Sequence, residues 1–261
     1  MSTALLTRPC SPAGPSVTEP TPFAHESVLL DRVLELFAPV PAGTVVDATL
    51  GGAGHAAALL EARADLRVLG LDQDPDALAA AQARLAPFGN RATTHHARFD
   101  RLASVVAASG AAIQPIVGVL FDLGVSSPQF DRPERGFSYR NEAAIDMRMD
   151  TTGGRTAGDL VNDLPERELA AVLRRNADER FAGRIARAIV AARPLLTTTD
   201  LAAVVVEAIP APARRTGGHP AKRTFQALRI EVNDELGVLE RALPAAIEAL
   251  AVGGRIAVIT F

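Results

Sequence analysis

Short apolar segments alternate with amphipathic helical patterns along the first half of the chain, and this alternation constrains the fold most. The segments TVVDAT, RVLGLD, ATTHHA and IVGVLFDL predict strands, and a helical pattern stands between each pair of them. Strands that are apolar throughout belong in a parallel sheet with both faces covered, connected by right-handed crossovers. The alternation therefore predicts a doubly wound, mostly parallel α/β domain.

The alternation stops between Arg132 and Arg223, where the patterns are helical or loop-like and none predicts a strand. This stretch is expected to be a helical insertion. The segment TFQALRIEVNDELGVLERALPAAIEAL follows as a long helical pattern, which we expect to break or kink near Pro244. GGRIAVITF then predicts another strand, so the sheet should resume after the insertion.

The ends of the chain and its single cysteine set further limits. A tail rich in Ser, Thr, Pro, Ala and Gly is expected to be disordered, and Cys10 within it excludes a disulfide framework or a multi-cysteine metal site. No His, Asp or Cys cluster has metal-ligand spacing, so no metal is expected. No apolar run suits a membrane span or a signal peptide, which favours a cytoplasmic protein without a membrane partner. The expected divisions are a disordered tail over 1–22, the α/β domain over 23–131 and 224–261, and the helical insertion over 132–223.

A cluster of small residues follows the first predicted strand, in DATLGGAGHAAALL. Gly52, Gly54 and Ala57 satisfy the permissive nucleotide-binding pattern G-x-G-x-x-G/A, and Asp72 ends the second strand at a suitable distance to accept hydrogen bonds from a ribose. Small residues at such a turn can also serve only to let the helix approach the sheet. A triphosphate-binding loop is excluded, because no Gly-Lys-Ser/Thr follows the glycines.

Asp47 stands at the end of the first strand, just before the glycines. A carboxylate there repels a pyrophosphate but attracts a ligand with an ammonium group, and S-adenosylmethionine carries both that group and a ribose. A helix-capping role for Asp47 is the alternative. Asp72 and a further acid, Asp122, end the second and fourth strands, and Leu71 and Phe99 are candidates to cover an adenine. Together these features favour a methyltransferase over a dehydrogenase.

The segment FDLGVSSPQFD follows the fourth strand, at the edge where open α/β sheets bind their ligands. It carries the carboxyl group of Asp122, the hydroxyls of Ser126 and Ser127 and the amide of Gln129. The hydroxyls and the amide suit the donor and acceptor edge of a cytosine. A loop that merely turns the chain is the alternative.

Seven phrases occur in the order seen in the bacterial small-subunit ribosomal RNA cytosine-N4 methyltransferases, the RsmH or MraW family, which the chain resembles over residues 25–261. The resemblance implies a Rossmann-like S-adenosylmethionine methyltransferase domain with an inserted all-helical domain. It also implies methylation of the exocyclic N4 of cytidine 1402 in 16S rRNA. The phrases are HESVLLDRVLELF, DATLGGAGH, GLDQDP, FDLGVSSPQFDRPERGFSYR, DMRMD, ERFAGRIARAI and HPAKRTFQALRIEVNDEL.

Two departures from the family pattern have physical consequences. Where the family typically has GGH, this chain has AGH, and Ala53 costs roughly 1 kcal/mol or more if its position requires a left-handed conformation. The family also continues after ITF with a region that completes the sheet, so the resemblance implies an unpaired edge at RIAVITF and leaves the activity of this chain open. An inactive fragment that binds cofactor or RNA is one alternative, and a methyltransferase with another acceptor is a second. The resemblance implies cofactor contacts at Ala53, Gly54, His55, Asp72, Phe99, Asp122 and Gln129.

The substrate is expected to be 16S rRNA in the small ribosomal subunit. Between Arg167 and Arg229 twelve basic residues stand against five acidic ones, a local net charge of +7 in a chain of net charge −3. This excess predicts phosphate contacts, with a solvated helix face as the alternative. Methyl transfer should be direct, without a cysteine nucleophile, and Asp122 is the candidate catalytic group that orients N4. An internal salt bridge is an equally open role for Arg148, and the candidate substrate contacts are Ser126, Ser127, Arg148, Lys222 and Arg223.

Overall fold

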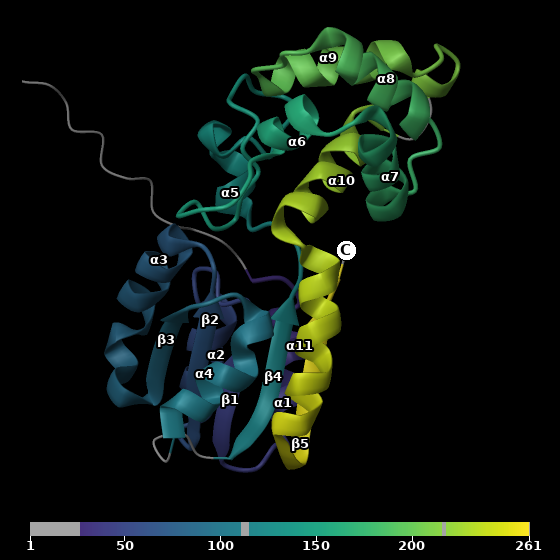
Figure 1. Cartoon of the computed structure of the whole chain (residues 1–261). Helices are drawn as coiled ribbons and strands as arrows, with labels where there is room; N and C mark the ends of the chain where they lie inside the picture. The colour runs from purple at the N-terminus through teal and green to yellow at the C-terminus, as the bar shows by residue number, and fades with distance from the viewer. Residues whose placement is uncertain (1–26, 111–114, 216–217, 261) are drawn as a thin grey trace, which may run out of the picture.

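The computed structural model describes residues 27–110, 115–215 and 218–260, apart from the side chains of Ser127, Pro128 and Arg215. The predicted disordered tail, with Cys10, lies outside these residues, so that prediction is not tested. Figure 1 shows two parts: a sheet covered by helices, and a group of helices beyond one end of the sheet.

Five parallel strands form one sheet in the order β3-β2-β1-β4-β5. The chain places β1, β2 and β3 in one direction and then returns to add β4 and β5 on the other side of β1, so the doubly wound prediction is confirmed. The carboxyl ends of the strands meet at one edge, where a crevice forms between β1 and β4. The strands are β1 Gly43–Asp47, β2 Leu66–Asp72, β3 Ala92–His96, β4 Ile116–Asp122 and β5 Leu250–Ile259.

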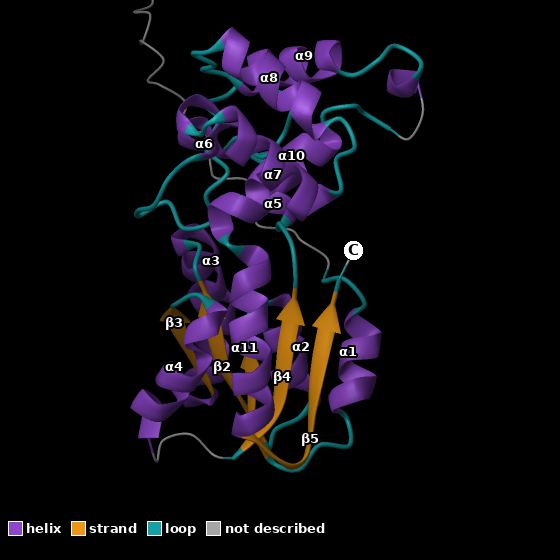
Figure 2. Cartoon of the chain, turned by 45° about the vertical axis from the view of Figure 1, so that its right-hand side comes forward, coloured by secondary structure: helices purple, strands orange, loops and turns teal. Residues whose placement is uncertain are grey.

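Helices cover both faces of this sheet because neighbouring strand residues point to opposite sides. Val45 of β1 packs with the cluster of α1 and α2, whereas the next residue, Val46, packs with that of α4 and α11. Figure 2 shows β4 and β5 pointing toward the helical part. The helices on the sheet are α1 Leu30–Phe37, α2 Gly54–Ala62, α3 Pro75–Leu85, α4 Leu102–Ser109 and α11 Glu235–Ala249, with 3-10 turns at Ala86–Arg91 and Phe99–Arg101.

The helical part has an apolar core of its own, which includes Leu173, Ile185, Leu201 and Phe225. Apart from an isolated bridge between Ala144 and Thr197, it contains no strand within the described residues. An all-helical insertion is therefore observed. Its helices are α5 Ser127–Asp131, α6 Ala157–Asp163, α7 Glu166–Ala177, α8 Ala182–Ala192, α9 Thr198–Ala208 and α10 Lys222–Asn233, with 3-10 turns at Pro133–Arg135 and Ala213–Arg215.

The domain limits given above stay a prediction, but α10 bears on them. Phe225, Ala227 and Leu228 of α10 pack into the core of the helical part. We therefore propose that the insertion extends to the end of α10 at Asn233, rather than ending at Arg223.

The long helical pattern near the carboxyl end is interrupted at Asp234 and not at Pro244. Asp234 adopts a left-handed conformation, with φ of 51°, and separates α10 from α11. Pro244 lies inside α11, which continues to Ala249, so the predicted break near Pro244 is wrong. Aspartate visits the left-handed region more readily than most residues, so a single residue can end one helix and begin the next.

Strand β5 forms one side edge of the sheet, since within the described chain it pairs with β4 alone. Val252 and Val258 of this strand are exposed. The unpaired edge implied by the resemblance is therefore present among the described residues. No helix among them is long and apolar enough to cross a membrane.

Candidate active site

A cavity of about 910 Å³ lies between the carboxyl ends of the strands and the helical part. Its sheet side carries the glycine turn after β1 together with Asp72, Phe99 and Asp122. Its helical side carries Tyr139 and one face of α10. Residues from distant parts of the chain thus line one continuous space.

Asp72 fixes the backbone on the sheet side of the cavity. Its Oδ2 accepts a hydrogen bond of 2.7 Å from the Gly51 amide, and its Oδ1 accepts one of 2.8 Å from the Asp74 amide. Burial raises the pKa of Asp72, while these amides partly offset the rise. A carboxylate has about four acceptor positions, so Asp72 retains capacity for a ligand hydroxyl.

Ala53 occupies the left-handed conformation that the sequence analysis identified as costly. Its φ is 60° and its ψ is 31°, which costs an alanine roughly 1–2 kcal/mol. The surroundings hold it there, because Ala53 is fully buried and its amide donates a hydrogen bond of 2.8 Å to Leu50 O. Ala53 does not line the cavity, whereas Gly54 and His55 do.

The segment before α1 closes over the glycine turn. Nε2 of His55 lies 2.9 Å from the carbonyl oxygen of Val28, to which it donates. A Cβ at Gly54 would overlap the hydroxyl of Ser27, so a larger residue there would require the Ser27 side chain to move. Ser27 and Val28 thereby join the cavity wall, which the sequence analysis did not foresee.

Asp47 lies behind this wall and not on its surface. Its side chain is buried, and its closest hydrogen bond is a long one of 3.4 Å from the Thr49 amide. Burial raises the pKa of Asp47 to about 7, and the charges of Asp72 and Asp122 add to the rise. Asp47 does not cap α2, because that helix has no side-chain cap. Any attraction between Asp47 and a cationic ligand would therefore act across the wall.

Asp122 ends β4 and lines the cavity beside the glycine turn. Its amide donates a hydrogen bond of 2.6 Å to Thr49 Oγ1, which ties the end of β4 to the end of β1. Ser126 and Gln129 line the same cavity. The amide of Ser126 donates to Gln129 Oε1 at 3.1 Å, so the glutamine side chain shapes the loop after β4.

Behind this loop is a buried polar cluster that the sequence analysis missed. Nε2 of Gln129 donates to Asp74 Oδ2 at 2.8 Å, and Nη1 of Arg135 donates to the same oxygen at 2.9 Å. Nη2 of Arg135 donates to the carbonyl oxygens of Arg148 and Met149 at 3.1 and 3.0 Å. One guanidinium thus joins the turn after β2 to the loop before α6.

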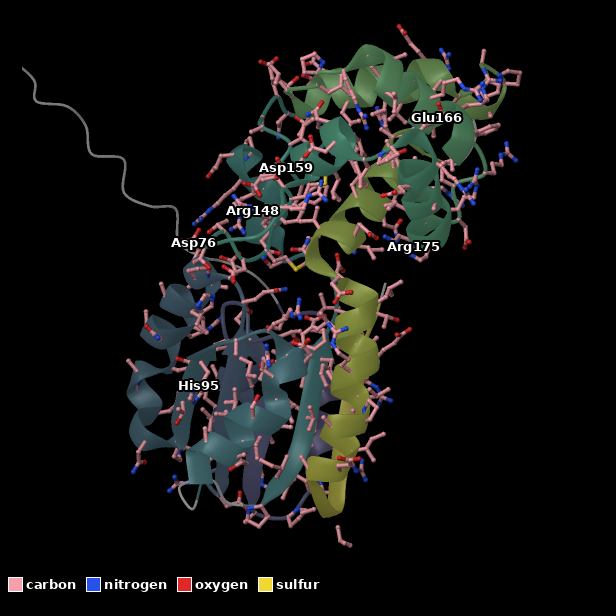
Figure 3. The ribbon with its side chains drawn as sticks, viewed as in Figure 1. Asp76, His95, Arg148, Asp159, Glu166 and Arg175 are labelled. Carbon is pink, nitrogen blue, oxygen red and sulfur yellow. The ribbon has the colours of Figure 1, made fainter. Side chains whose placement is uncertain are left out.

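Arg148 forms the internal salt bridge that was the alternative to a substrate contact. Its Nε and Nη2 donate to the two carboxylate oxygens of Asp146, each at 2.8 Å, and its Nη1 donates to Gly153 O at 3.3 Å. Arg148 does not line the cavity. Figure 3 labels it on the side of the helical part that faces the sheet.

Lys222 and Arg223 begin α10 but differ in surroundings. Lys222 lines the cavity, whereas Arg223 does not and instead donates from Nη1 to the carbonyl oxygens of Ala177 and Asp178 at 3.1 and 3.0 Å. Ser127 begins α5, but its side chain lies outside the described part.

Much of the predicted basic surface is bound within the protein. Two of the ion pairs join Arg175 to Glu231 and Arg187 to Glu166, and Figure 3 labels Arg175 and Glu166 on the helical part. The net charge of +7 therefore overstates the charge available to a partner. Four basic residues of this stretch have side chains that make no hydrogen bond, ion pair or ring contact with any described residue, namely Arg167, Arg174, Arg184 and Lys222.

No group of three His, Cys, Asp or Glu side chains that could hold a metal is present in the described residues. Several cavity residues near the helical part were not predicted, although the spacing within HPAKRTFQALRIEVNDEL could have indicated those that belong to this segment. The unpredicted lining residues are Phe137, Tyr139, Met149, Phe225, Gln226, Asn233 and Glu235.

Comparisons with known proteins identify the family of the chain. Residues 22–261 match the MraW methylase family. The chain is 52% identical over 261 residues to the ribosomal RNA small subunit methyltransferase H of Mycolicibacterium paratuberculosis, covering 95% of this chain and 68% of the relative. It is 53% identical over 254 residues to the protein of that name from Mycobacterium tuberculosis H37Rv, covering 93% of this chain and 64% of the relative. The chain thus spans about two thirds of the length of these relatives.

Among solved structures, an rRNA methylase from Streptococcus thermophilus is 21% identical with a TM-score of 0.30, over 44% of this chain and 67% of that one. The family assignment rests on the sequence matches and not on this overlap. The chain belongs to the MraW methylase family.

Proposed function

We propose that this chain transfers a methyl group from S-adenosylmethionine to the exocyclic N4 of a cytidine, cytidine 1402, in the 16S rRNA of the small ribosomal subunit. Membership of a methylase family supports methyl transfer, and the relatives named above are small-subunit rRNA methyltransferases by name. The observation that carries the proposal is the single cavity, which joins an acidic, glycine-rich wall to an aromatic and basic one. Such a reaction belongs in the cytoplasm, where ribosomal subunits are present.

The sheet side of the cavity has the groups that S-adenosylmethionine requires. The remaining acceptor positions of Asp72 suit the ribose hydroxyls. The ring of Phe99 suits the adenine, and its edge-on contact with Phe121, at 5.5 Å between ring centroids and 71° between planes, fixes its orientation. The backbone of the glycine turn and His55 would lie against the methionine portion. When bound, the sulfonium supplies an activated methyl group.

Asp122 is the proposed orienting group for the acceptor. A carboxylate oxygen at the end of β4 would accept a hydrogen bond from the N4 amino group and turn the nitrogen lone pair toward the methyl carbon. Thr49 holds the backbone of Asp122 in place. Alignment of this kind can supply roughly 7–11 kcal/mol of the barrier reduction. Ser126, which lines the same cavity, is proposed to contact the base edge, whereas the predicted contact of Ser127 stays a prediction because its side chain lies outside the described part.

The target base must leave its stack to reach Asp122, so the protein must also bind the flanking RNA outside the cavity. We propose that three arginines bind this RNA, because they lie outside the cavity wall and their side chains have no described partner, namely Arg167, Arg174 and Arg184. Arg148 and Arg223 act instead as structural anchors, because their guanidinium groups are engaged within the protein.

The test is methyl transfer to small subunits isolated from cells that lack this modification, with N4-methylcytidine measured by mass spectrometry of the digested rRNA. The wild-type chain should form this nucleoside, and Asp122→Ala should lower the rate at least about 100-fold if alignment depends on the carboxylate. Asp200→Asn is the matched control, because this exposed carboxylate lies on α9, away from the cavity. Unchanged transfer by the Asp122 variant would remove it from this role.

A chain that binds without turning over is the second candidate, since β5 leaves exposed valines at the sheet edge. Calorimetric titration with S-adenosylmethionine and with NAD shows which cofactor the chain binds, and comparison with the methyl-transfer assay distinguishes the two candidates. Binding of S-adenosylmethionine without any methylated nucleoside supports the second candidate. Preference for NAD contradicts both.

A further inference from the structure

We propose that the helical side of the cavity is a stacking site for the acceptor nucleobase, with the ring of Tyr139 as its platform. The inference rests on the proposed function in taking RNA as the acceptor, and it names the residue that holds the base. Tyr139 is the single tyrosine of the chain, which also contains no tryptophan.

Neighbouring rings hold Tyr139 in a fixed plane. The imidazole of His219 stacks on it at 4.3 Å between ring centroids and 11° between planes, and Phe225 meets it edge-on at 5.6 Å and 84°. The His219 ring is itself held, because its Nδ1 accepts a hydrogen bond from the Ala221 amide at 3.2 Å. Because His219 covers one face of the tyrosine ring, the base would stack on the other face. A ring ordered before binding loses little entropy when a base stacks on it.

Helix α10 lines the cavity beside this platform with a continuous stripe of side chains. Lys222, Phe225, Gln226 and Arg229 all line the cavity, and their spacing of three and four residues places them on one helix face. The stripe thus combines an aromatic ring, an amide and two cations. These are the groups that single-stranded nucleic acid sites use for bases and phosphates.

The two cations of the stripe, Lys222 and Arg229, differ in whether a carboxylate is already paired with them. Lys222 makes no ion pair with any described residue and begins α10, next to the stacked rings. Arg229 is held by Glu235 through two bonds of 2.7 and 3.1 Å. We therefore assign the phosphate of the acceptor nucleotide to Lys222.

Packing alone explains only part of this arrangement. Tyr139 does touch the core of the helical part, but it is half-buried and lines the cavity. Its hydroxyl makes no hydrogen bond with any described residue. At about 910 Å³ the cavity is also near the upper end of the roughly 300–1,000 Å³ typical of small-molecule sites, which leaves room for a base beside the donor.

The single tyrosine makes a direct test possible. Protein grown with 3-fluorotyrosine carries one fluorine reporter, at Tyr139. With S-adenosylhomocysteine saturating the donor site, the resonance should move on addition of cytidine 5′-monophosphate and stay in place with ribose 5-phosphate, which has the phosphate but no base. Absence of a shift with cytidine monophosphate, or an equal shift with ribose 5-phosphate, overturns the proposal.

Kinetics provide the second readout. Tyr139→Leu should raise the KM for small subunits on the order of ten-fold while leaving the affinity for S-adenosylmethionine unchanged, and Tyr139→Phe should restore the KM. A rise that Phe does not reverse, or a parallel loss of donor affinity, contradicts a stacking role. If the wild-type chain methylates no RNA, the proposed function fails, whereas the fluorine shift still decides whether a base binds at Tyr139.

Discussion

Arg135 donates a hydrogen bond of 2.9 Å from Nη1 to Oδ2 of Asp74, and both side chains are more than nine-tenths buried. Asp74 also begins α3, because its Oδ1 accepts a hydrogen bond of 3.0 Å from the Asp76 amide. The pair therefore links the turn that follows Asp72 to the loop before α6. We infer that it keeps the two sides of the cavity in register.

Loss of the Arg135 charge should destabilise the protein strongly. Arg135→Met leaves the Asp74 carboxylate buried without its cation, which typically costs about 3–5 kcal/mol of the free energy of unfolding. Urea denaturation measures this difference. Arg132→Met is the matched control, because the ion pair of Arg132 with Asp76 is exposed and should contribute less than about 1 kcal/mol. Equal effects of the two substitutions would contradict the account.

The left-handed conformation of Ala53 predicts an unequal response to two substitutions. Ala53→Gly should change the free energy of unfolding by less than about 1 kcal/mol, since relief of the strained φ offsets the lost methyl burial and the added chain entropy. Ala53→Val should lower it by more than about 2 kcal/mol, because a branched side chain tolerates neither the conformation nor the full burial. Thermal or urea unfolding compares the two variants, and a valine variant as stable as the glycine one would disprove the strain.

The raised pKa of Asp47 predicts how stability depends on pH. The native state holds a proton on Asp47 up to a pKa of about 7, whereas the unfolded chain releases it near 3.8. Between these values the native state binds more protons, so the contribution of Asp47 to stability falls as pH rises and is constant above pH 7. Asp47→Asn removes this titration, and its stability relative to wild type should therefore grow by a few kcal/mol from pH 4 to pH 7.

Unfolding by urea at several pH values measures the effect of Asp47→Asn. Asp131→Asn serves as the control, because this carboxylate is exposed at the end of α5 and its replacement should leave the wild-type profile unchanged. If the free energy of unfolding depended on pH in the same way for wild type and the Asp47 variant, burial would not hold a proton on Asp47.

The unpaired cations of the helical part predict a salt-dependent effect on RNA binding. Arg174→Gln and Arg184→Gln should each weaken binding of 16S rRNA and lower the slope of log K against log salt by about 1, if each contacts one phosphate. Arg193→Gln is an unsuitable control, because its guanidinium supports the backbone at Val161 and Leu164. Arg187→Gln is a better control, because the guanidinium of Arg187 already forms an exposed ion pair with Glu166. Filter binding at several salt concentrations separates these outcomes.

The sheet could be predicted from sequence because its signals are local. A few residues suffice to predict an apolar strand such as IVGVLFDL. A few residues likewise suffice to predict the start of α3, which is marked by a proline. The helix break could not, because Pro244 is a conspicuous signal whereas the left-handed Asp234 resembles any other helix residue. Local pattern thus fixes the elements better than it fixes where a helix ends.

Residues of the site were predictable where they end a strand, as with Asp72 and Asp122, because the carboxyl ends of parallel strands share one edge of the sheet. The pairing of Arg135 with Asp74 was not, since it joins residues 61 positions apart. Sequence likewise cannot distinguish an arginine engaged by backbone carbonyls, such as Arg223, from one available to RNA.

We propose that one cavity brings a methyl donor and a ribosomal cytidine together. The most direct measurement incubates small subunits lacking the modification with this chain and donor labelled in its methyl group, then locates the label in the rRNA. The account predicts label on N4 of a single cytidine of 16S rRNA. Label on another atom, or none although the donor binds, would contradict it.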